Sequence, residues 1–290
     1  MSPGYLPFAG ALELPVFLCD NCGSWQRGFA KPTGCPMCSD ARHVMPQKGW
    51  RFWTADEAQR SFLCHWAEVE DGVWRFWNDP VDGIGPSGYL VRTPGGNMMF
   101  EGCTVYSDAA LDALAGLGGV DVLSASHPHS YGALWQIQDR FDPELALPPG
   151  DLAWSAALRV SWPYDDTLEP LPGLHLHVTA GHFDGHAVLF DERRGILFCG
   201  DALKFELDPA SPRDALTISA HKAFVRGIPL TPNELRRYRD VFAALDFRQT
   251  WTPFEQARNS GRTEALALID SMLATRPHAY PVPLAELRGG

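Results

Sequence analysis

Residues 120–132 read VDVLSASHPHSYG, an apolar run that leads directly into two histidines. The run 120–125 has the length and apolar character of a buried strand, and the residues after it form a loop. His127 and His129 are two positions apart, so on an extended loop their side chains project to the same side. Pro128 between them stiffens the backbone. The stretch therefore predicts that a buried strand delivers two imidazoles to one metal ion.

Two later segments also place a metal ligand just after a strand. Leu174–Thr179 is expected to be a strand and is followed by AGHFDGH, in which His182 is the next ligand. Gly195–Cys199 is expected to be another strand, and Asp201 follows it closely. Imidazole and carboxylate groups bind zinc and other transition metals. Three loops that each leave a strand and each offer a ligand indicate one shared site, made of His127, His129, His182 and Asp201.

The flanking sequence alternates strands and helices. The segments 89–92 and 97–100 flank a Thr-Pro-Gly-Gly turn and predict a hairpin. Thr231-Pro232-Asn233-Glu234 combines a capping box with proline at the first helical position. The proline-rich tail from Pro277 is expected to be irregular. Helices are expected over four segments: 107–117, 130–141, 231–245 and 263–274. Strands punctuated by helices, with chemistry in the connecting loops, favour a layered α/β domain.

From about Gly88 to the C terminus, these motifs make the chain resemble the metallo-β-lactamase superfamily. Ser126-His127-Pro128-His129 is similar to the first half of the family's His-x-His-x-Asp-His motif. Ala180-Gly181-His182 resembles its Pro-Gly-His stretch, and Gly200-Asp201 resembles the segment that carries its bridging aspartate. The resemblance implies a four-layered αββα sandwich over residues 49–290, with the metal site at one edge of the sheets.

The chain departs from the family pattern where the second metal ion would bind. Tyr131 and Gly132 occupy the positions of an aspartate and a histidine that hold this ion. In the opening hairpin, which also resembles that of the family, Glu101 stands where an aspartate is usual. The final histidine of the family is missing near Trp251, where the sequence reads TPFE. The resemblance therefore implies a single ion, held by the three histidines and Asp201. The chain is similar to an uncharacterised branch of the superfamily with a reduced metal motif of this kind.

A second cluster of metal ligands precedes this domain, in residues 1–48. Two Cys-x-x-Cys pairs are separated by twelve residues and supply Cys19, Cys22, Cys35 and Cys38. Four thiolates on two short turns suit the tetrahedral coordination of zinc or iron. Residues 17–40 resemble the rubredoxin-like module of rubrerythrins, which holds one iron and carries electrons. The same sulfurs also suit a zinc-ribbon module, and without an obvious redox partner in the chain we favour structural zinc.

The histidine site predicts a metal-dependent hydrolase. Three imidazoles leave one or two coordination positions open, and zinc in such a site generates hydroxide near neutral pH. That hydroxide is expected to attack an ester, lactone, thioester or amide. Asp201 is expected to complete the coordination or orient the attacking water. Tyr131 follows the ligands closely, and it is either a hydrogen-bond donor to the oxyanion or a packed wall residue. Zinc is the expected ion here, with iron or manganese as alternatives.

Two other functions remain open at this point. In the first, the cysteine module carries iron and passes electrons to an iron ion in the histidine site, for chemistry with oxygen or peroxide. In the second, the fold is a non-catalytic descendant of a hydrolase and serves only for binding. Neither the ligand types nor their spacing separates these alternatives from the hydrolase.

Composition narrows the choice of partners. The formal net charge is −11, which repels phosphate backbones, so we expect no nucleic acid as a partner. No run approaches about 20 apolar residues, the length that a membrane-spanning helix needs, and residues 1–18 lack the basic start of a secretion signal. We therefore expect a cytoplasmic protein that acts on a small molecule. The loops at about 141–170 and 204–230 are expected to line the substrate pocket. The sequence does not indicate an oligomeric state.

Overall fold

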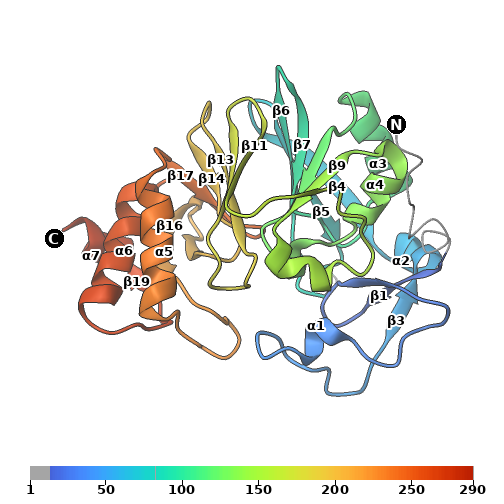
Figure 1. Ribbon diagram of the computed structural model, residues 1–290, viewed down its shortest axis with the longest axis horizontal. Helices are drawn as coiled ribbons and strands as arrows, with labels where there is room; N and C mark the ends of the chain where they lie inside the picture. The colour runs from blue at the N-terminus through green and yellow to red at the C-terminus, as the bar shows by residue number, and fades with distance from the viewer. Residues whose placement is uncertain (1–13, 82, 290) are drawn as a thin grey trace.

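The computed structural model describes residues 14–81 and 83–289. Residues 1–13, most of the segment for which we expect no secretion signal, lie outside this range. Figure 1 shows two sheets packed face to face, helices on both outer sides, and the N-terminal module, in blue, at one edge of the sandwich. No helix in the described part of the chain combines the length and apolar character needed to cross a membrane.

The first sheet has seven strands in the order β10-β9-β8-β7-β6-β5-β4. Strands β4 to β7 pair antiparallel, as consecutive hairpins do, whereas β7, β8, β9 and β10 pair parallel. The predicted hairpin is confirmed as β6 and β7. The bounds are β4 Leu63–Glu70, β5 Val73–Asp79, β6 Gly88–Thr93, β7 Gly96–Phe100, β8 Val122–Ser124, β9 Glu144–Leu147 and β10 Trp162–Pro163.

The second sheet has six strands in the order β11-β12-β13-β14-β17-β18. Only β14 and β17 pair parallel, because the segment between them crosses over the outer face of the sheet. The two predicted strands at 174–179 and 195–199 are confirmed as β12 and β14. The bounds are β11 Thr167–Leu171, β12 Leu174–Val178, β13 Ala187–Asp191, β14 Ile196–Phe198, β17 Gln249–Trp251 and β18 Gln256–Ala257.

Three apolar cores separate four layers. The central core lies between the sheets and includes Phe100 from one sheet and Trp251 from the other, both fully buried. A second core lies between the first sheet and helices α3 (Asp108–Gly116) and α4 (Leu134–Phe141). A third lies between the second sheet and helices α5 (Pro232–Ala243) and α6 (Arg262–Ala274). The αββα sandwich implied by the sequence is therefore confirmed.

Local sequence explains where the helices begin. Ser107 caps α3 by accepting a hydrogen bond from the backbone N–H of Ala110. At the start of α5, Thr231 and Glu234 form the predicted capping box, in which each side chain bonds the backbone of the other residue. Such a box satisfies two backbone N–H groups that have no partner inside the helix.

The C-terminal tail is more regular than predicted. Strand β19 (Val282–Pro283) pairs with β16 (Ser211–Ser219), which also pairs with β15 (Lys204–Asp208). Helix α7 (Leu284–Arg288) follows, and its Leu284 is buried in the third core. The expectation of an irregular tail is therefore wrong. The proline content of the tail suggested irregular structure, but the burial of apolar side chains against α6 and β16 stabilises a short strand and helix there.

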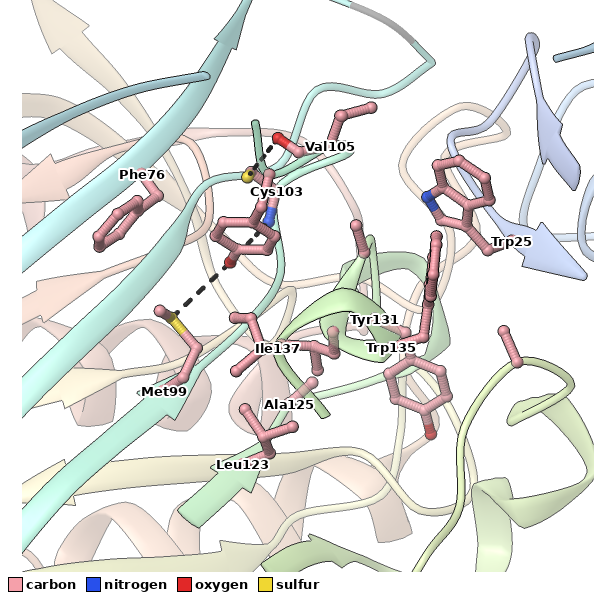
Figure 2. Packing of buried hydrophobic residues seen from close by; sticks show 14 of the residues in the cluster. Trp25, Phe76, Met99, Cys103, Val105, Leu123, Ala125, Tyr131, Trp135 and Ile137 are labelled. Carbon is pink, nitrogen blue, oxygen red and sulfur yellow. Dashed lines mark hydrogen bonds between the residues drawn. The ribbon is translucent and has the colours of Figure 1, made fainter. Parts of the chain in front are cut away.

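The N-terminal module forms its own three-stranded sheet, with β1 (Val16–Cys19) between β2 (Trp25–Arg27) and β3 (Phe52–Thr54). It also contains α1 (Pro36–Ser39) and α2 (Ala55–Ser61). The module packs tightly on the sandwich through Trp25. The Trp25 ring lies 5.2 Å from the Trp135 ring, and its Nε1 donates to the Thr104 carbonyl at 2.8 Å. Figure 2 shows Trp25 reaching from the blue module towards the core around Trp135 and Ile137.

Candidate functional site

The four residues predicted to share one metal ion come together in the structure. His127 leaves the end of β8, His182 follows β12, and Asp201 follows β14. One donor atom from each of these residues and one from His129 all lie within 4.8 Å of one another, and all four residues are buried. The loop differs in one detail from the expectation: His127 is extended, but His129 lies in the 3-10 turn η1 (Pro128–Ser130). The two rings still meet, with their centroids 5.3 Å apart.

Hydrogen bonds turn one nitrogen of each anchored ring towards Asp201. His182 Nδ1 donates to the Lys222 carbonyl at 2.8 Å, and His127 Nδ1 lies 2.7 Å from the Ser126 hydroxyl. The opposite nitrogens, Nε2 of His127 and Nε2 of His182, each lie 3.5 Å from Asp201 Oδ2. A metal-binding imidazole is commonly fixed in this way by a bond from its other nitrogen. The two rings are therefore oriented as binding to one shared metal ion requires.

The electrostatics of the four residues fit a bound cation. Burial lowers the pKa of all three histidines, that of His127 to about 3, so the rings are neutral at pH 7. A histidine can bind a metal ion only when its imidazole is neutral. Burial also raises the pKa of Asp201, because a buried carboxylate lacks the stabilisation that water would give. Nε2 of each histidine and Asp201 Oδ1 are buried without a hydrogen-bond partner among the described residues. A cation would satisfy these atoms.

A second set of buried polar residues forms hydrogen bonds with the loops that carry the ligands. Glu101 Oε2 accepts a hydrogen bond from the Ser126 backbone at 2.9 Å, and Ser126 in turn contacts His127. Burial raises the pKa of Glu101 to about 8, so this carboxyl is largely protonated at neutral pH. His186 bonds the Thr179 hydroxyl at 2.7 Å and does not belong to the metal-ligand group. Glu101 and His186 therefore hold the ligand loops in place.

The ligands open into a pocket of about 370 Å³. His129, His182 and Asp201 form its floor, and apolar side chains dominate the walls. The expected loop 204–230 contributes to the lining, but none of the lining residues comes from 141–170, so that half of the expectation is wrong. The remaining lining residues are Arg42, His43, Ile84, Leu203, Lys204, Phe224, Val225, Thr252, Phe254 and Glu255.

Arg42 and His43 reach the pocket from the N-terminal module, which the sequence did not indicate. The Arg42 guanidinium bonds both oxygens of Asp40, and its Nη1 donates to the His182 carbonyl at 3.0 Å. It also lies 3.6 Å from the centre of the Phe183 ring. Arg42 lowers the pKa of Asp40 through these bonds. No motif marks this pair, because Arg42 and His182 are 140 residues apart and meet only after folding.

Glu255 lines the pocket where the family's final histidine is missing. Its carboxylate bonds the Thr252 hydroxyl at 2.5 Å. Burial raises the pKa of Glu255 to about 7. A carboxyl group with this pKa exchanges protons near neutral pH, so Glu255 is a candidate for proton transfer in the pocket.

Tyr131 is not among the residues that line this pocket. It belongs to the core cluster that contains Trp25 and Trp135, as Figure 2 shows. Burial keeps its pKa well above the ordinary value, and its hydroxyl has no hydrogen-bond partner in the described part of the chain. His221 is also buried, with its ring against Phe224, and does not line the pocket.

The four predicted cysteine ligands also converge. Cys19 and Cys38 sulfurs are 3.7 Å apart, as are those of Cys22 and Cys35, and all four are buried. Sulfurs at the corners of a tetrahedron with metal–sulfur bonds of about 2.3 Å are roughly 3.8 Å apart. The cluster therefore has the dimensions of a tetrathiolate site for zinc or iron. The sulfurs are buried among apolar side chains, which include Phe17, Met37 and Phe52.

The fold and this ligand set define a class of protein. The family model of the metallo-beta-lactamase superfamily matches residues 81–277, which is most of the chain, so the chain belongs to this superfamily. Its members are typically metal-dependent hydrolases.

Individual relatives extend this result. The uncharacterized protein YmaE of Bacillus subtilis (strain 168) is 23% identical over 263 residues, which cover 87% of this chain and 93% of YmaE. The crystal structure of DIM-1 metallo-beta-lactamase superposes with a TM-score of 0.54 at 10% identity, over 73% of this chain and 99% of that one. VMB-1 gives a TM-score of 0.52 at 15% identity, over 72% and 97% of the two chains. These two structures establish likeness of fold alone.

Proposed function

We propose that this chain is a metal-dependent hydrolase with one catalytic ion, held by His127, His129, His182 and Asp201. One observation carries the proposal: four buried donor atoms lie within 4.8 Å of one another, and three of the residues that supply them, His129, His182 and Asp201, line an open pocket. Structural metal sites are closed, whereas catalytic sites keep a position open for water or substrate. Zinc bound there would lower the pKa of a water ligand to about 7 and polarise a substrate carbonyl.

The chain's own residues divide the remaining tasks. Asp201 offers Oδ2 towards the two Nε2 atoms, and its Oδ1 has no hydrogen-bond partner among the described residues. Oδ1 is therefore free to accept a hydrogen bond from the attacking water and orient it. Glu255, with a pKa of about 7, is placed in the same pocket to take a proton from that water or return it to the leaving group.

The pocket suits a small molecule with an apolar part. Its walls carry Ile84, Leu203, Phe224, Val225 and Phe254. A volume of about 370 Å³ lies within the range of ordinary small-molecule sites, which use apolar walls for affinity and a few polar groups for orientation. We propose an ester, lactone, thioester or amide with an apolar acyl or alcohol group as substrate. We further propose a cytoplasmic location and zinc in both sites, because a reducing compartment keeps thiolate ligands available.

Metal analysis combined with hydrolysis assays tests this function. The zinc-loaded chain is assayed on nitrophenyl esters, a lactone and a thioester, and its metal content is measured. We expect two ions per chain and hydrolysis of at least one substrate. Replacing His127 and His129 together with alanine should remove one ion and lower the rate at least a thousandfold. His175→Ala is the matched control, because His175 lies on β12 and pairs with Glu192 outside the pocket. Full activity in the double variant would refute the proposal.

One observation also supports the redox alternative. Phe183 packs in the cysteine cluster, and its ring centre lies 5.0 Å from that of His129. A single aromatic ring thus lies in the apolar cluster around the cysteines and also contacts a histidine ligand. A visible spectrum distinguishes the two functions: a red ferric tetrathiolate in the purified chain supports electron transfer, whereas a colourless chain with two zinc ions supports the hydrolase.

A further inference from the structure

The loop after the last cysteine ligand, within the N-terminal module, forms one wall of the pocket and presents His43 beside the metal ligands. The His43 ring lies 5.5 Å from the His129 ring, centre to centre. His43 is only 7% exposed although it lines the pocket, so its ring is held rather than free in solvent. The hydrogen bonds of its two ring nitrogens decide whether His43 can donate or accept a hydrogen bond in the pocket.

Hydrogen bonds fix the position of the proton on the His43 ring. The backbone N–H of Val44 donates to Nδ1 at 2.8 Å. The Val44 carbonyl also lies 3.0 Å from Nδ1, but the Val44 N–H always carries its hydrogen and points at Nδ1, so a second hydrogen on that nitrogen would face it. A nitrogen that accepts carries no hydrogen in the neutral ring, so the proton is on Nε2. Nε2 is buried and has no partner among the described residues. His43 therefore carries an unused N–H donor on a ring that lines the pocket.

Asn21 ties this loop to the cysteine cluster. Its side-chain amide donates to Cys38 Sγ at 3.2 Å and to the Val44 carbonyl at 2.7 Å. Asn21 lies between the first two cysteines in the sequence, so its position depends on the turn that presents their sulfurs. Arg42 anchors the other side of the loop through its bond to the His182 carbonyl. The cysteine module thus holds His43 at a defined place relative to the histidine site.

We propose that His43 is a catalytic residue of the hydrolase, and that Asn21 is a positioning residue that acts through it. This inference rests on the proposed function. As the oxygen of water adds to the substrate carbon, the π pair of the carbonyl bond moves onto the carbonyl oxygen, which becomes negative. The Nε2–H of His43 donates a hydrogen bond to that oxygen, and the proton stays on the ring. Removing one donor of this kind typically lowers kcat by about 10²–10³.

Variants of His43 test the donor directly in the zinc-loaded full chain. His43→Ala should lower kcat about a hundredfold with little change in KM, while two ions per chain remain. His43→Gln should recover part of the loss, because its side-chain amide offers an N–H. Met45→Ala is the control from the same loop, since Met45 is 57% exposed and does not line the pocket. An unchanged kcat in His43→Ala, or loss of one ion, would overturn the inference in favour of a wall residue or a ligand.

Asn21 gives a second test that a merely structural residue would not pass. Asn21→Ala should lower kcat by a smaller factor than His43→Ala. The double variant should be no slower than His43→Ala alone, because a residue that acts through His43 has nothing left to position. Losses that multiply in the double variant would contradict the link between the two residues.

Two measurements do not depend on hydrolysis. Nitrogen NMR of histidine-labelled chain, assigned with His43→Gln, should show the proton of His43 on Nε2; a proton on Nδ1 overturns the inference. Methylphosphonate, a tetrahedral anion, should bind His43→Ala about tenfold more weakly than wild type by calorimetry. If the wild type hydrolyses none of the substrates and the difference in methylphosphonate binding still appears, the proposed function fails and His43 remains a hydrogen-bond donor. If wild type hydrolyses and His43→Ala matches it in both assays, only the donor fails.

Discussion

The two metal-ligand clusters of this chain differ in how they are built and in what surrounds them. The cysteine ligands lie within a single short stretch, Cys19 to Cys38, and their sulfurs are buried in a mainly apolar cluster, where the Asn21 amide donates to Cys38 Sγ. The histidine-site ligands come from three loops between His127 and Asp201, and three of them, His129, His182 and Asp201, line a pocket. A closed site has no room for substrate, whereas an open one does. Both clusters bring four donor atoms together, but only the histidine site is open to a substrate.

We infer that the cysteine cluster depends little on the histidine site, whereas the histidine site depends on the module that carries the cysteines. The sulfurs are presented by turns within the N-terminal module, while the pocket of the histidine site takes Arg42 and His43 from that module. We therefore expect damage to the cysteine cluster to reach the histidine site. The following changes test this asymmetry in order of decreasing effect.

Removing two sulfurs should have the largest effect. Cys35→Ser with Cys38→Ser should release one ion, because the remaining pair cannot hold it, and structural zinc contributes on the order of 10 kcal/mol in small peptides. We expect loss of at least several kcal/mol of stability, seen as a fall in Tm of more than about 10 °C. Differential scanning calorimetry and elemental analysis measure both. Cys64→Ala, a buried cysteine outside the cluster, is the control. An unchanged Tm would mean that the cluster is not structural.

Phe183→Ala should come next, because the ring is 1% exposed, belongs to the apolar cluster around the cysteine ligands and lies against His129. Truncating a buried phenylalanine costs about 3–5 kcal/mol, measured by denaturant unfolding. Phe183→Leu, which keeps most of the volume, should cost about 1 kcal/mol. If the ring joins the two clusters, the alanine variant should also lose metal from both more readily to a chelator. Faster loss from only one cluster would show that the two are independent.

Glu101 should make stability depend on pH. Burial raises its pKa from an ordinary value near 4.5 to about 8. Between these values the unfolded chain has released the proton and the folded chain still holds it, so stability falls as pH rises from 4.5 to 8. Each pKa unit corresponds to about 1.4 kcal/mol. Glu101→Gln should remove this contribution, so that wild type loses a few kcal/mol more than the variant over the same range of pH. Parallel curves for the two proteins would exclude a neutral Glu101.

The smallest effect should come from a helix cap that contacts neither ligand set. Thr231→Ala removes the capping hydroxyl at the start of α5 and should cost about 1 kcal/mol by chemical denaturation. Metal content and activity should stay at the wild-type level. Thr231→Ser keeps the hydroxyl and should cost less than half as much. A loss of metal in Thr231→Ala would show that stability alone, and not the link between the clusters, controls metal retention.

The strongest predictions from the sequence concern residues whose role is set locally or by a shared pattern. His127 and His129 follow a buried strand directly, and the cysteine pairs carry their own turns, so both ligand sets could be identified. Arg42 and His43 could not, because they gain their role only when the module docks on the sandwich. Tyr131 shows the opposite case: it stands near the ligands in sequence, yet the 3-10 turn after His127 carries it into the core with Trp135.

The short span of the cysteine ligands has a consequence for the order of synthesis. Residue 38 leaves the ribosome long before His127, so the module can take up its ion while most of the chain is still unmade. The histidine site must wait for Asp201, and its pocket for Glu255. Because the N-terminal part of a chain generally folds first during translation, the loaded module would be ready as a docking platform when the sandwich forms.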